Sequence, residues 1–325
     1  MRVSPAIRAS FVAAIVGALL LVAACGSPGT GSSNNNSGSS QKKATSVKTG
    51  NPPTPVTLQE AGSSLLFPYL QQLTSPLTQK YSNITLSPAA GGSGTGQAEA
   101  ISGTIDMGGS DAYLSPAQFQ QDAGLMNVPI AISSQAVNFN LKGVSSLNLT
   151  GNVLAQIYEG KITNWNSSAI SSLNPGVTLP NETIVPIRRV DSSGDTFIFT
   201  SFLSATNSAW SNGPSLGTTV AWPAVSGELS FSGNPAMVQG LMATPGSIAY
   251  VGISVEQTAL QAGLGEGALQ NKSGKYVKPD ATTVLAAVAA GAKSIPANLA
   301  ASLIYEPGAQ SYPIVNYEYL IIQSK

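Results

Sequence analysis

The feature that most constrains this chain is a pattern that occurs three times, in which a short apolar or small-residue strand is followed by a tight turn and a helix start. The three units occupy residues 62–80, 84–102 and 184–203. Each turn places free backbone N–H groups at the beginning of a helix. Further strand-like runs occur at residues 105–111, 128–132, 135–140, 247–253 and 314–323, and helical patterns at 153–156 and 282–290. This alternation predicts an α/β fold in which helices pack on sheets.

The third unit contains two adjacent arginines, Arg188 and Arg189, just before its helix start. The other arginines of the chain, Arg2 and Arg8, precede an apolar run near the N-terminus. A guanidinium is a planar fork of donors that suits tetrahedral oxyanions and carboxylates. Beside a helix start it predicts an anion-binding site, whereas the alternative is a surface turn with two solvated arginines.

Two features of the composition exclude whole classes of function. Lys and Arg number 15 against 15 Asp and Glu, and charged residues make up only 9% of the chain, so no broad positive field could hold a nucleic acid. Histidine is absent, which removes Ser-His and Cys-His nucleophile pairs and imidazole-ligated metal sites. We therefore expect no nucleic-acid partner, and most hydrolase mechanisms are excluded.

The N-terminal region has the layout of an export signal. Arg2 and Arg8 precede an apolar stretch that is shorter than the roughly 20 residues needed to span a bilayer, and small residues lead up to Cys25, the single cysteine. We predict a signal peptide at residues 1–24. Residues 25–56 are rich in Gly, Ser and Asn, cannot bury apolar surface and predict a disordered tether.

Several segments of the remaining chain carry a family pattern. They are residues 61–68 (AGSSLLFP), 92–94 (GSG), 109–115 (GSDAYLS), 157–165 (IYEGKITNW), 173–176 (LNPG) and 188–196 (RRVDSSGDT). With these segments the chain resembles the phosphate-binding lipoprotein that serves as substrate-binding protein of the bacterial ABC-type phosphate importer, and most of all its actinobacterial branch. The resemblance covers residues 57–325.

The resemblance implies a two-lobe α/β fold of the periplasmic-binding-protein-like type II, with a hinge between the lobes. It places the N-terminal part of the first lobe at residues 57–137, the second lobe at 138–319 and a return strand to the first lobe at 320–325. Relatives continue beyond this point with mainly helical chain. We therefore expect a C-terminally truncated chain whose first lobe lacks its C-terminal helices and leaves an apolar face uncovered.

The same resemblance implies which residues hold the ligand. In that family backbone and hydroxyl groups at three helix starts, one arginine and one aspartate bind the phosphate oxygens. Carried over position by position, the expected phosphate-binding residues are Leu66, Phe67, Ser93, Asp111, Arg189, Ser193, Gly194 and Asp195. Leu66 stands where relatives often have threonine, so only its amide remains. Asp195 also replaces a threonine, and it either faces the ligand, favouring doubly protonated phosphate, or caps its helix.

Asp111 provides the expected discrimination between phosphate and sulfate. An ionised carboxylate only accepts hydrogen bonds, so it needs a ligand oxygen that still carries a proton. Phosphate near neutral pH has such a proton and sulfate does not. A site that penalises the missing donor can discriminate by factors of about 10⁴ to 10⁵.

The family also implies partners and a location. We expect inorganic phosphate as ligand and the membrane permease subunits of a phosphate ABC importer as partner. The resemblance implies a binding protein that is not an enzyme and uses no metal and no cofactor. It also implies a monomer that is lipid-anchored, for example by palmitate, through Cys25 on the outer face of the cell membrane. Three alternatives remain: a secreted phosphatase or other hydrolase, the same fold binding sulfate, molybdate or an organic phosphate, and a surface adhesin without a ligand. The absence of histidine and the presence of only six aspartates disfavour the hydrolase.

Overall fold

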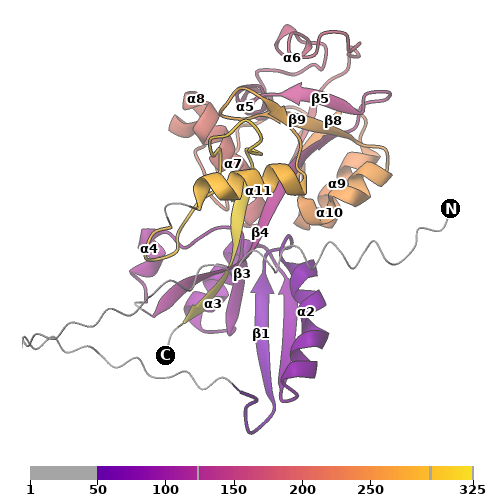
Figure 1. The fold of residues 1–325 in the computed structure, drawn as a ribbon. Helices are drawn as coiled ribbons and strands as arrows, with labels where there is room; N and C mark the ends of the chain where they lie inside the picture. The colour runs from indigo at the N-terminus through magenta and orange to yellow at the C-terminus, as the bar shows by residue number, and fades with distance from the viewer. Residues whose placement is uncertain (1–49, 123, 293–294, 324–325) are drawn as a thin grey trace, which may run out of the picture. The chain divides into compact units, whose positions relative to one another are not determined.

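The computed structural model describes residues 50–122, 124–292 and 295–323 of the 325-residue chain. Strands and helices alternate along this part in a mixed α/β fold, as the sequence predicts (Figure 1). The predicted signal peptide, Cys25 and most of the predicted tether lie outside the described residues. None of the helices in the described ranges is both long and apolar enough to pass through a membrane.

The first part of the sheet contains strands from both ends of the described chain. Its strand order is β2 (Ile84–Ala90), β1 (Val56–Gly62), β3 (Met107–Ser110), β11 (Val315–Gln323) and β4 (Leu125–Phe139). β1 pairs in parallel with β2 and β3, whereas β11 is antiparallel to β3 and β4. Because β11 is inserted between β3 and β4, the end of the described chain supports the strand that leads to Asp111.

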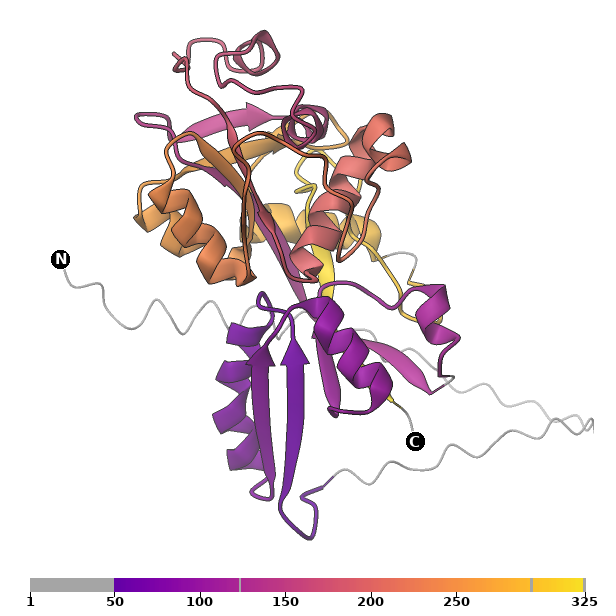
Figure 2. The ribbon, with the colours of Figure 1, turned by 180° about the vertical axis from the view of Figure 1, so that it is seen from behind.

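The second part of the sheet begins on the same long strand. Its order is β4, β8 (Ser247–Gly252), β6 (Val185–Arg189) and β7 (Leu229–Phe231), and β9 (Gly265–Gln270), which also pairs with β4, carries β5 (Ser146–Leu149) and β10 (Tyr276–Val277). β4 pairs with β11 over 125–134 and with β8 over 135–139. One strand therefore takes part in both regions of the sheet (Figures 1 and 2). The lobe limits given by the family resemblance remain a prediction.

Ten helices are described alongside these strands. They are α2 (Phe67–Lys80), α3 (Ser93–Ser102), α4 (Pro116–Phe119), α5 (Gly151–Tyr158), α6 (Ser168–Ser171), α7 (Gly194–Thr206), α8 (Ser208–Asn212), α9 (Gly233–Ala243), α10 (Ile253–Gln261) and α11 (Ala281–Gly291). α2, α3 and α7 follow β1, β2 and β6, as the three-fold repetition of the strand–turn–helix pattern predicts. α2 continues through Pro76.

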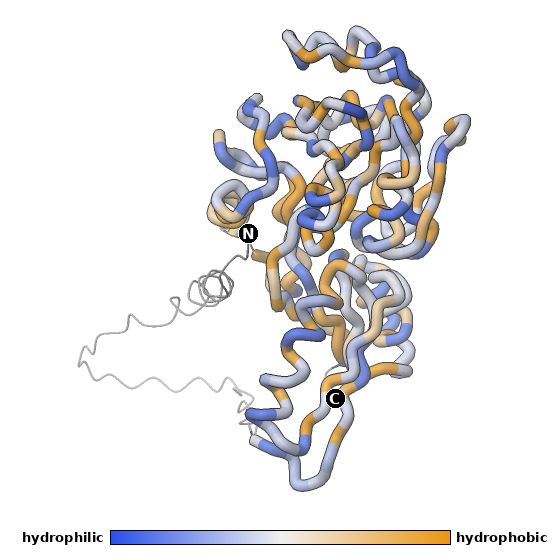
Figure 3. Tube along the Cα trace, turned by 90° about the vertical axis from the view of Figure 1, so that its right-hand side faces the viewer, coloured by the Kyte–Doolittle hydropathy of each residue, from blue (hydrophilic) through white to orange (hydrophobic). Residues whose placement is uncertain are grey.

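Large aromatic side chains form much of the core around the second part of the sheet. Tyr250 and Phe199 stack with ring centroids 4.4 Å apart, and Tyr158 meets Phe199 edge-on at 5.0 Å. Offset and edge-on ring pairs of this kind add to the stabilisation that burial provides. Figure 3 shows hydrophobic stretches along the interior strands and hydrophilic stretches in the outer loops. This core holds β6 and α7, the two elements between which residues 188–196 run.

Candidate anion-binding site

The predicted site residues from three separate segments meet at the beginning of α7. The N–H of Asp111 donates to the hydroxyl of Ser93 over 3.1 Å, which joins the end of β3 to the start of α3. Gly194 packs directly on both: a Cβ added to it would lie 2.6 Å from the Cβ of Asp111, with the Ser93 hydroxyl and Asp111 Oδ2 nearer still. Only glycine allows this approach, so the close packing explains the residue type at position 194.

Asp111 is buried, with 1% of its surface exposed. The Ser63 hydroxyl donates to Asp111 Oδ1, and the Asn316 amide donates to the Asp111 carbonyl over 2.7 Å. Asp111 Oδ2 receives no hydrogen bond from the N–H and hydroxyl groups of the described ranges. Burial, reinforced by the negative charge of Asp195, raises the Asp111 pKa to about 6. Near neutral pH the group is a buried carboxylate with one oxygen that can still accept a hydrogen bond.

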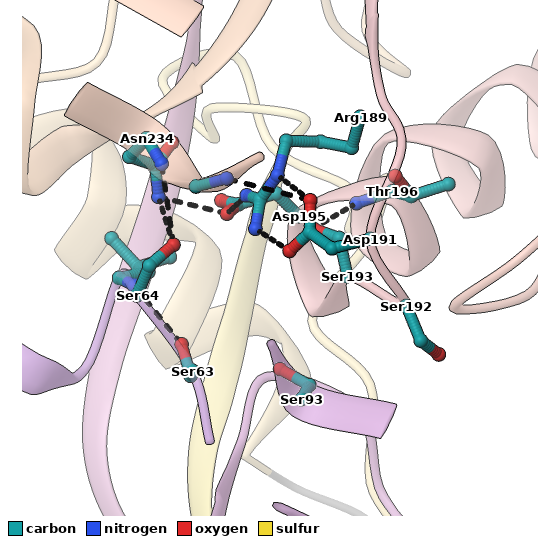
Figure 4. A network of polar contacts seen from close by, with 12 residues as sticks. Ser63, Ser64, Ser93, Arg189, Asp191, Ser192, Ser193, Asp195, Thr196 and Asn234 are labelled. Carbon is teal, nitrogen blue, oxygen red and sulfur yellow. Dashed lines mark hydrogen bonds and ion pairs between the residues drawn. The ribbon is translucent and has the colours of Figure 1, made fainter. Parts of the chain in front are cut away.

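Arg189 ends β6 and is held by two aspartates. Its Nε donates to Asp191 Oδ1 over 2.7 Å, Nη2 donates to Asp191 Oδ2, and Nη1 pairs with Asp195 Oδ2 at 2.6 Å (Figure 4). The Arg189 N–H donates to the Tyr250 hydroxyl over 3.0 Å, which fixes the backbone. Burial opposes the charged form, but the Asp191 hydrogen bond and the two aspartate charges together raise the Arg189 pKa. The guanidinium therefore stays charged.

The guanidinium of Arg189 retains donors for a ligand. It has five N–H groups, and the two aspartates use three of them. The other two have no acceptor in the part of the chain that the structure describes. A cavity of about 330 Å³ reaches this arginine, with a lining that includes Ser64, Gly92, Asp191 and Gly233. The cavity gives the guanidinium an approach from outside.

The Asp195 side chain neither faces a ligand nor caps its helix, so the prediction for it is corrected. Its Oδ2 also accepts from Asn234 Nδ2 at 2.8 Å and its Oδ1 accepts from Gln135 Nε2 at 3.0 Å, in addition to the Arg189 ion pair. The helix cap is Ser193, whose hydroxyl accepts from the Thr196 N–H at 3.3 Å. The Asp195 side chain thus neither caps α7 nor presents an unpaired acceptor, because three donors from the protein already surround it.

The beginning of α7 supplies free backbone donors. The N–H groups of Gly194 and Asp195 have no acceptor among the residues described, whereas the following amide is capped by Ser193. Free N–H groups at a helix start carry a partial positive charge and favour an anion. The Ser193 hydroxyl accepts from its helix and keeps its own proton for donation. This helix start is therefore suited to a ligand oxygen.

The beginning of α2 differs from the prediction. The Leu66 N–H donates to the Ser63 hydroxyl over 3.1 Å, and the Phe67 N–H donates to the Ser63 carbonyl over 3.0 Å. Both amides that were expected to bind the ligand are thus occupied. The physical reason is local, since Ser63 follows β1 and closes the turn on the first amides of the helix.

Comparisons with known proteins show the family to which the chain belongs. The family model described as "PBP superfamily domain" matches residues 39–325. The phosphate-binding protein PstS of Methanocaldococcus jannaschii is 30% identical over 286 residues, which cover 83% of this chain and 73% of that protein. PstS of Xylella fastidiosa strain 9a5c is 33% identical over 272 residues, covering 83% and 72%. The chain belongs to this family of phosphate-binding proteins.

Solved structures of phosphate-binding proteins share the fold. A periplasmic phosphate-binding protein, PfluDING, solved with bound phosphate, superposes with a TM-score of 0.64 at 23% identity and covers 82% of this chain and 80% of its own. A substrate-binding protein of a phosphate ABC transporter from Clostridium perfringens, described as putative and solved with phosphate, gives 0.59 at 18% identity, covering 83% and 87%. The periplasmic-binding-protein-like fold predicted from the sequence is confirmed.

The structure also adds residues that the sequence reasoning missed. They are Ser63, Gln135, Asp191, Asn234 and Glu318, all within the network around the predicted site. Asp191 had a usable signal, because residues two apart at a strand end point to the same side. Glu318 had another, since it is the one acid in the run of residues 312–322. Asn234 and Gln135 come from remote segments and have no such signal.

Proposed function

We propose that this chain binds inorganic phosphate outside the cytoplasm and delivers it to the membrane subunits of an ABC-type importer. Its relatives are named phosphate-binding proteins, and two solved neighbours were determined with phosphate. The family consists of substrate-binding proteins, and we propose that the chain has no catalytic activity. The described residues include no group of three or more His, Cys, Asp or Glu placed to hold a metal ion.

The observation that carries the proposal is the buried carboxylate of Asp111. Its Oδ2 has no donor among protein N–H and O–H groups of the described segments and lies against Gly194, at a helix start with free amides. A protonated oxyanion can donate to this oxygen, whereas a fully ionised one would bring an acceptor against an acceptor. Phosphate fits this requirement and sulfate does not.

The remaining ligand contacts would come from donors around Asp111. We propose that the hydroxyls of Ser93 and Ser193, the amides of Gly194 and Asp195 and the two unused N–H groups of Arg189 bind the other oxygens. All of them are donors, in keeping with an anion. Leu66 and Phe67 are left out of this set because Ser63 already accepts from their N–H groups.

Binding between these groups requires movement. Gly194 is in direct contact with Asp111 and Ser93, and the Gly94 N–H donates to the Ser192 carbonyl over 2.9 Å, so an ion can enter only if α3 and α7 separate. We propose that the lobes at residues 57–137 and 138–319 open and close about a hinge. β4 is the strand that pairs in both parts of the sheet and is a candidate for this hinge.

Export and anchoring complete the proposal. We propose that residues 1–24 are removed, that Cys25 carries the lipid and that residues 25–56 tether a monomeric binding protein at the outer face of the membrane. The support is the sequence pattern of an export signal with small residues before a single cysteine. Metabolic labelling with a radioactive fatty acid, on the parent and on Cys25→Ser, tests it; equal labelling of both would contradict the anchor.

Isothermal titration with phosphate, followed by competition with arsenate, tests the binding function. We expect one phosphate per chain and displacement by arsenate, which is also tetrahedral and protonated. A chain that shows no heat with phosphate while folded would contradict the proposal. Release of phosphate from a chromogenic ester would instead favour the alternative of a secreted phosphatase.

A further inference from the structure

Glu318 is a buried acid in β11 and the one acidic or basic residue of that strand. Only 1% of its surface is exposed. β11 pairs with β3 so that Tyr319 lies opposite Ser110, and this register brings Glu318 alongside Asp111, which follows β3. The Ser133 hydroxyl, from β4, donates to Glu318 Oε1. Glu318 therefore lies beside the acceptor of the proposed phosphate site, on the neighbouring strand.

The two carboxyl groups are within hydrogen-bonding reach of each other. Each has one buried oxygen without an N–H or O–H donor from the described part of the protein, namely Asp111 Oδ2 and Glu318 Oε2. Two adjacent ionised carboxylates in a buried site repel each other, and a single proton between them removes the repulsion and serves as the missing donor. The geometry therefore requires one proton in this pair.

We propose that Glu318 is a positioning residue that keeps one proton beside Asp111 and so presents Asp111 to phosphate as an oriented, ionised acceptor. The inference rests on the proposed function, because it assigns the partner of the group that would meet the ligand. Each carboxylate oxygen has two lone pairs, so Asp111 can accept from Glu318 and from a phosphate hydroxyl together.

The surroundings of the pair favour the proton on Glu318 over Asp111. Burial and the neighbouring Asp111 charge raise the Glu318 pKa well above its usual value. The pKa of Asp111 rises only to about 6, since hydrogen bonds from Glu318 and Ser63 and the charge of Arg189 partly offset its burial. The donors and charges around the pair thus favour ionisation of Asp111 and protonation of Glu318.

The other elements around Glu318 bring few charges. Asp195 of α7 adds a negative charge that opposes ionisation of Glu318, and Arg189 of β6 offsets part of the charge on Asp111. β4 contributes the neutral Ser133, Tyr319 is the next residue on β11, and the one ionisable residue of α3 is the half-buried Glu99. α11 contains no ionisable residue. The charges that act on the protonation of Glu318 are therefore mainly those of Asp111 and Asp195.

Loss of this proton has a predictable effect on binding. Above the upper apparent pKa of the pair, two adjacent carboxylates would face an incoming anion, and binding would require the uptake of one proton. Linkage then makes the affinity fall by about tenfold for each pH unit. A glutamine at position 318 can donate to Asp111 but cannot ionise, so this loss should disappear.

The test compares phosphate affinities of the parent and Glu318→Gln from neutral to strongly alkaline pH. Their ratio at each pH cancels the ligand's own protonation. We expect affinities within about threefold of each other at neutral pH and a ratio that rises in favour of the variant with pH, approaching tenfold per unit. Glu256→Gln is the matched control, because burial beside Glu266 raises the Glu256 pKa to about 8 away from the site, and its ratio should stay flat.

Ser133→Ala provides a second variant that keeps the carboxyl group. Removal of the Ser133 donor takes away a stabiliser of ionised Glu318, so the alkaline loss of affinity should move to higher pH. A ratio for Glu318→Gln that is constant with pH, at any size of loss, would overturn the inference, as would a Ser133→Ala profile identical to the parent's. Failure of the parent to bind phosphate at all would instead contradict the proposed function.

Discussion

Asp111 and Asp195 are equally buried, each with 1% of its surface exposed, yet their surroundings differ. Asp195 accepts from Arg189, Asn234 and Gln135, so donors from the protein surround its carboxylate. Asp111 has the Ser63 hydroxyl and the Glu318 carboxyl as neighbours, and its Oδ2 receives no hydrogen bond from an amide or hydroxyl group in the described ranges.

The difference teaches that burial does not assign a role to an acidic residue. The role depends on the available donors. A carboxylate whose oxygens all accept hydrogen bonds from the protein stabilises the structure, whereas one with a free oxygen can recognise a proton on a ligand. Asp195 thus serves to hold Arg189, and Asp111 serves as the proposed recognition group.

The largest expected effect tests the structural role of Asp195. Arg189→Ala removes its ion-pair partner and leaves a buried negative charge, which should lower the free energy of unfolding by about 3–5 kcal/mol. Chemical denaturation of the variant and the parent at the same pH measures the difference.

The adjacent arginine is the matched control. Arg188 pairs with Glu228 at 2.6 Å, but both side chains are partly exposed, so Arg188→Ala should cost no more than about 1 kcal/mol. Equal losses for the two variants would contradict the assignment of Asp195 as the buried partner of Arg189.

The pH dependence of stability should single out Asp111. Its pKa rises from 3.8 to about 6 on folding because it is buried, so the folded state binds the proton more tightly than the unfolded state. The stabilisation is therefore fully present below pH 3.8 and is lost as the pH rises through about 6. We expect the stability difference between the parent and Asp111→Asn to change by about 2–3 kcal/mol over this interval.

Thermal unfolding without ligand, across this range, measures the effect. Glu60→Gln is a useful comparison, because burial raises the Glu60 pKa to about 7 and its pH dependence extends higher. If Asp111→Asn follows the parent at every pH, the buried carboxyl of Asp111 is not the group that titrates.

The smallest expected effect concerns Ser63. Its hydroxyl donates to Asp111 and accepts from the Leu65 and Leu66 N–H groups, so Ser63→Ala removes both an acceptor at the start of α2 and a donor to the carboxylate. We expect a loss of about 1–2 kcal/mol in stability. Ser75→Ala, which removes an exposed contact with Gln79, should be nearly neutral, and a comparable loss there would contradict the role given to Ser63.

Much of the fold could be predicted from the sequence because local patterns carry it. The apolar run ending at residue 187 and the Ser193–Gly194 start gave β6 and α7, and Asp280 and Thr283 form a capping box at the start of α11. The two strand-like runs within residues 128–140 are one strand, since β4 continues through both parts of the sheet.

The candidate site could be predicted only in part. Ser93, Asp111, Arg189 and Gly194 come together as expected, because each belongs to a helix start or a strand end. It could not be foreseen that the N–H groups of Leu66 and Phe67 already donate to Ser63. Nor could it be foreseen that the Asp195 carboxylate accepts from Asn234 and Gln135. Such contacts are determined by tertiary packing, and no regular residue spacing in the sequence predicts them.

The central claim is that Asp111, and not Asp195, recognises a proton on the ligand. Titration of phosphate and sulfate into the parent, Asp111→Asn and Asp195→Asn at neutral pH tests it most directly. We predict that the parent prefers phosphate by a factor on the order of 10⁴, that Asp111→Asn loses at least about a hundredfold of this preference, and that Asp195→Asn keeps it. An unchanged preference in Asp111→Asn, or a collapse of the preference only in Asp195→Asn, would contradict the account.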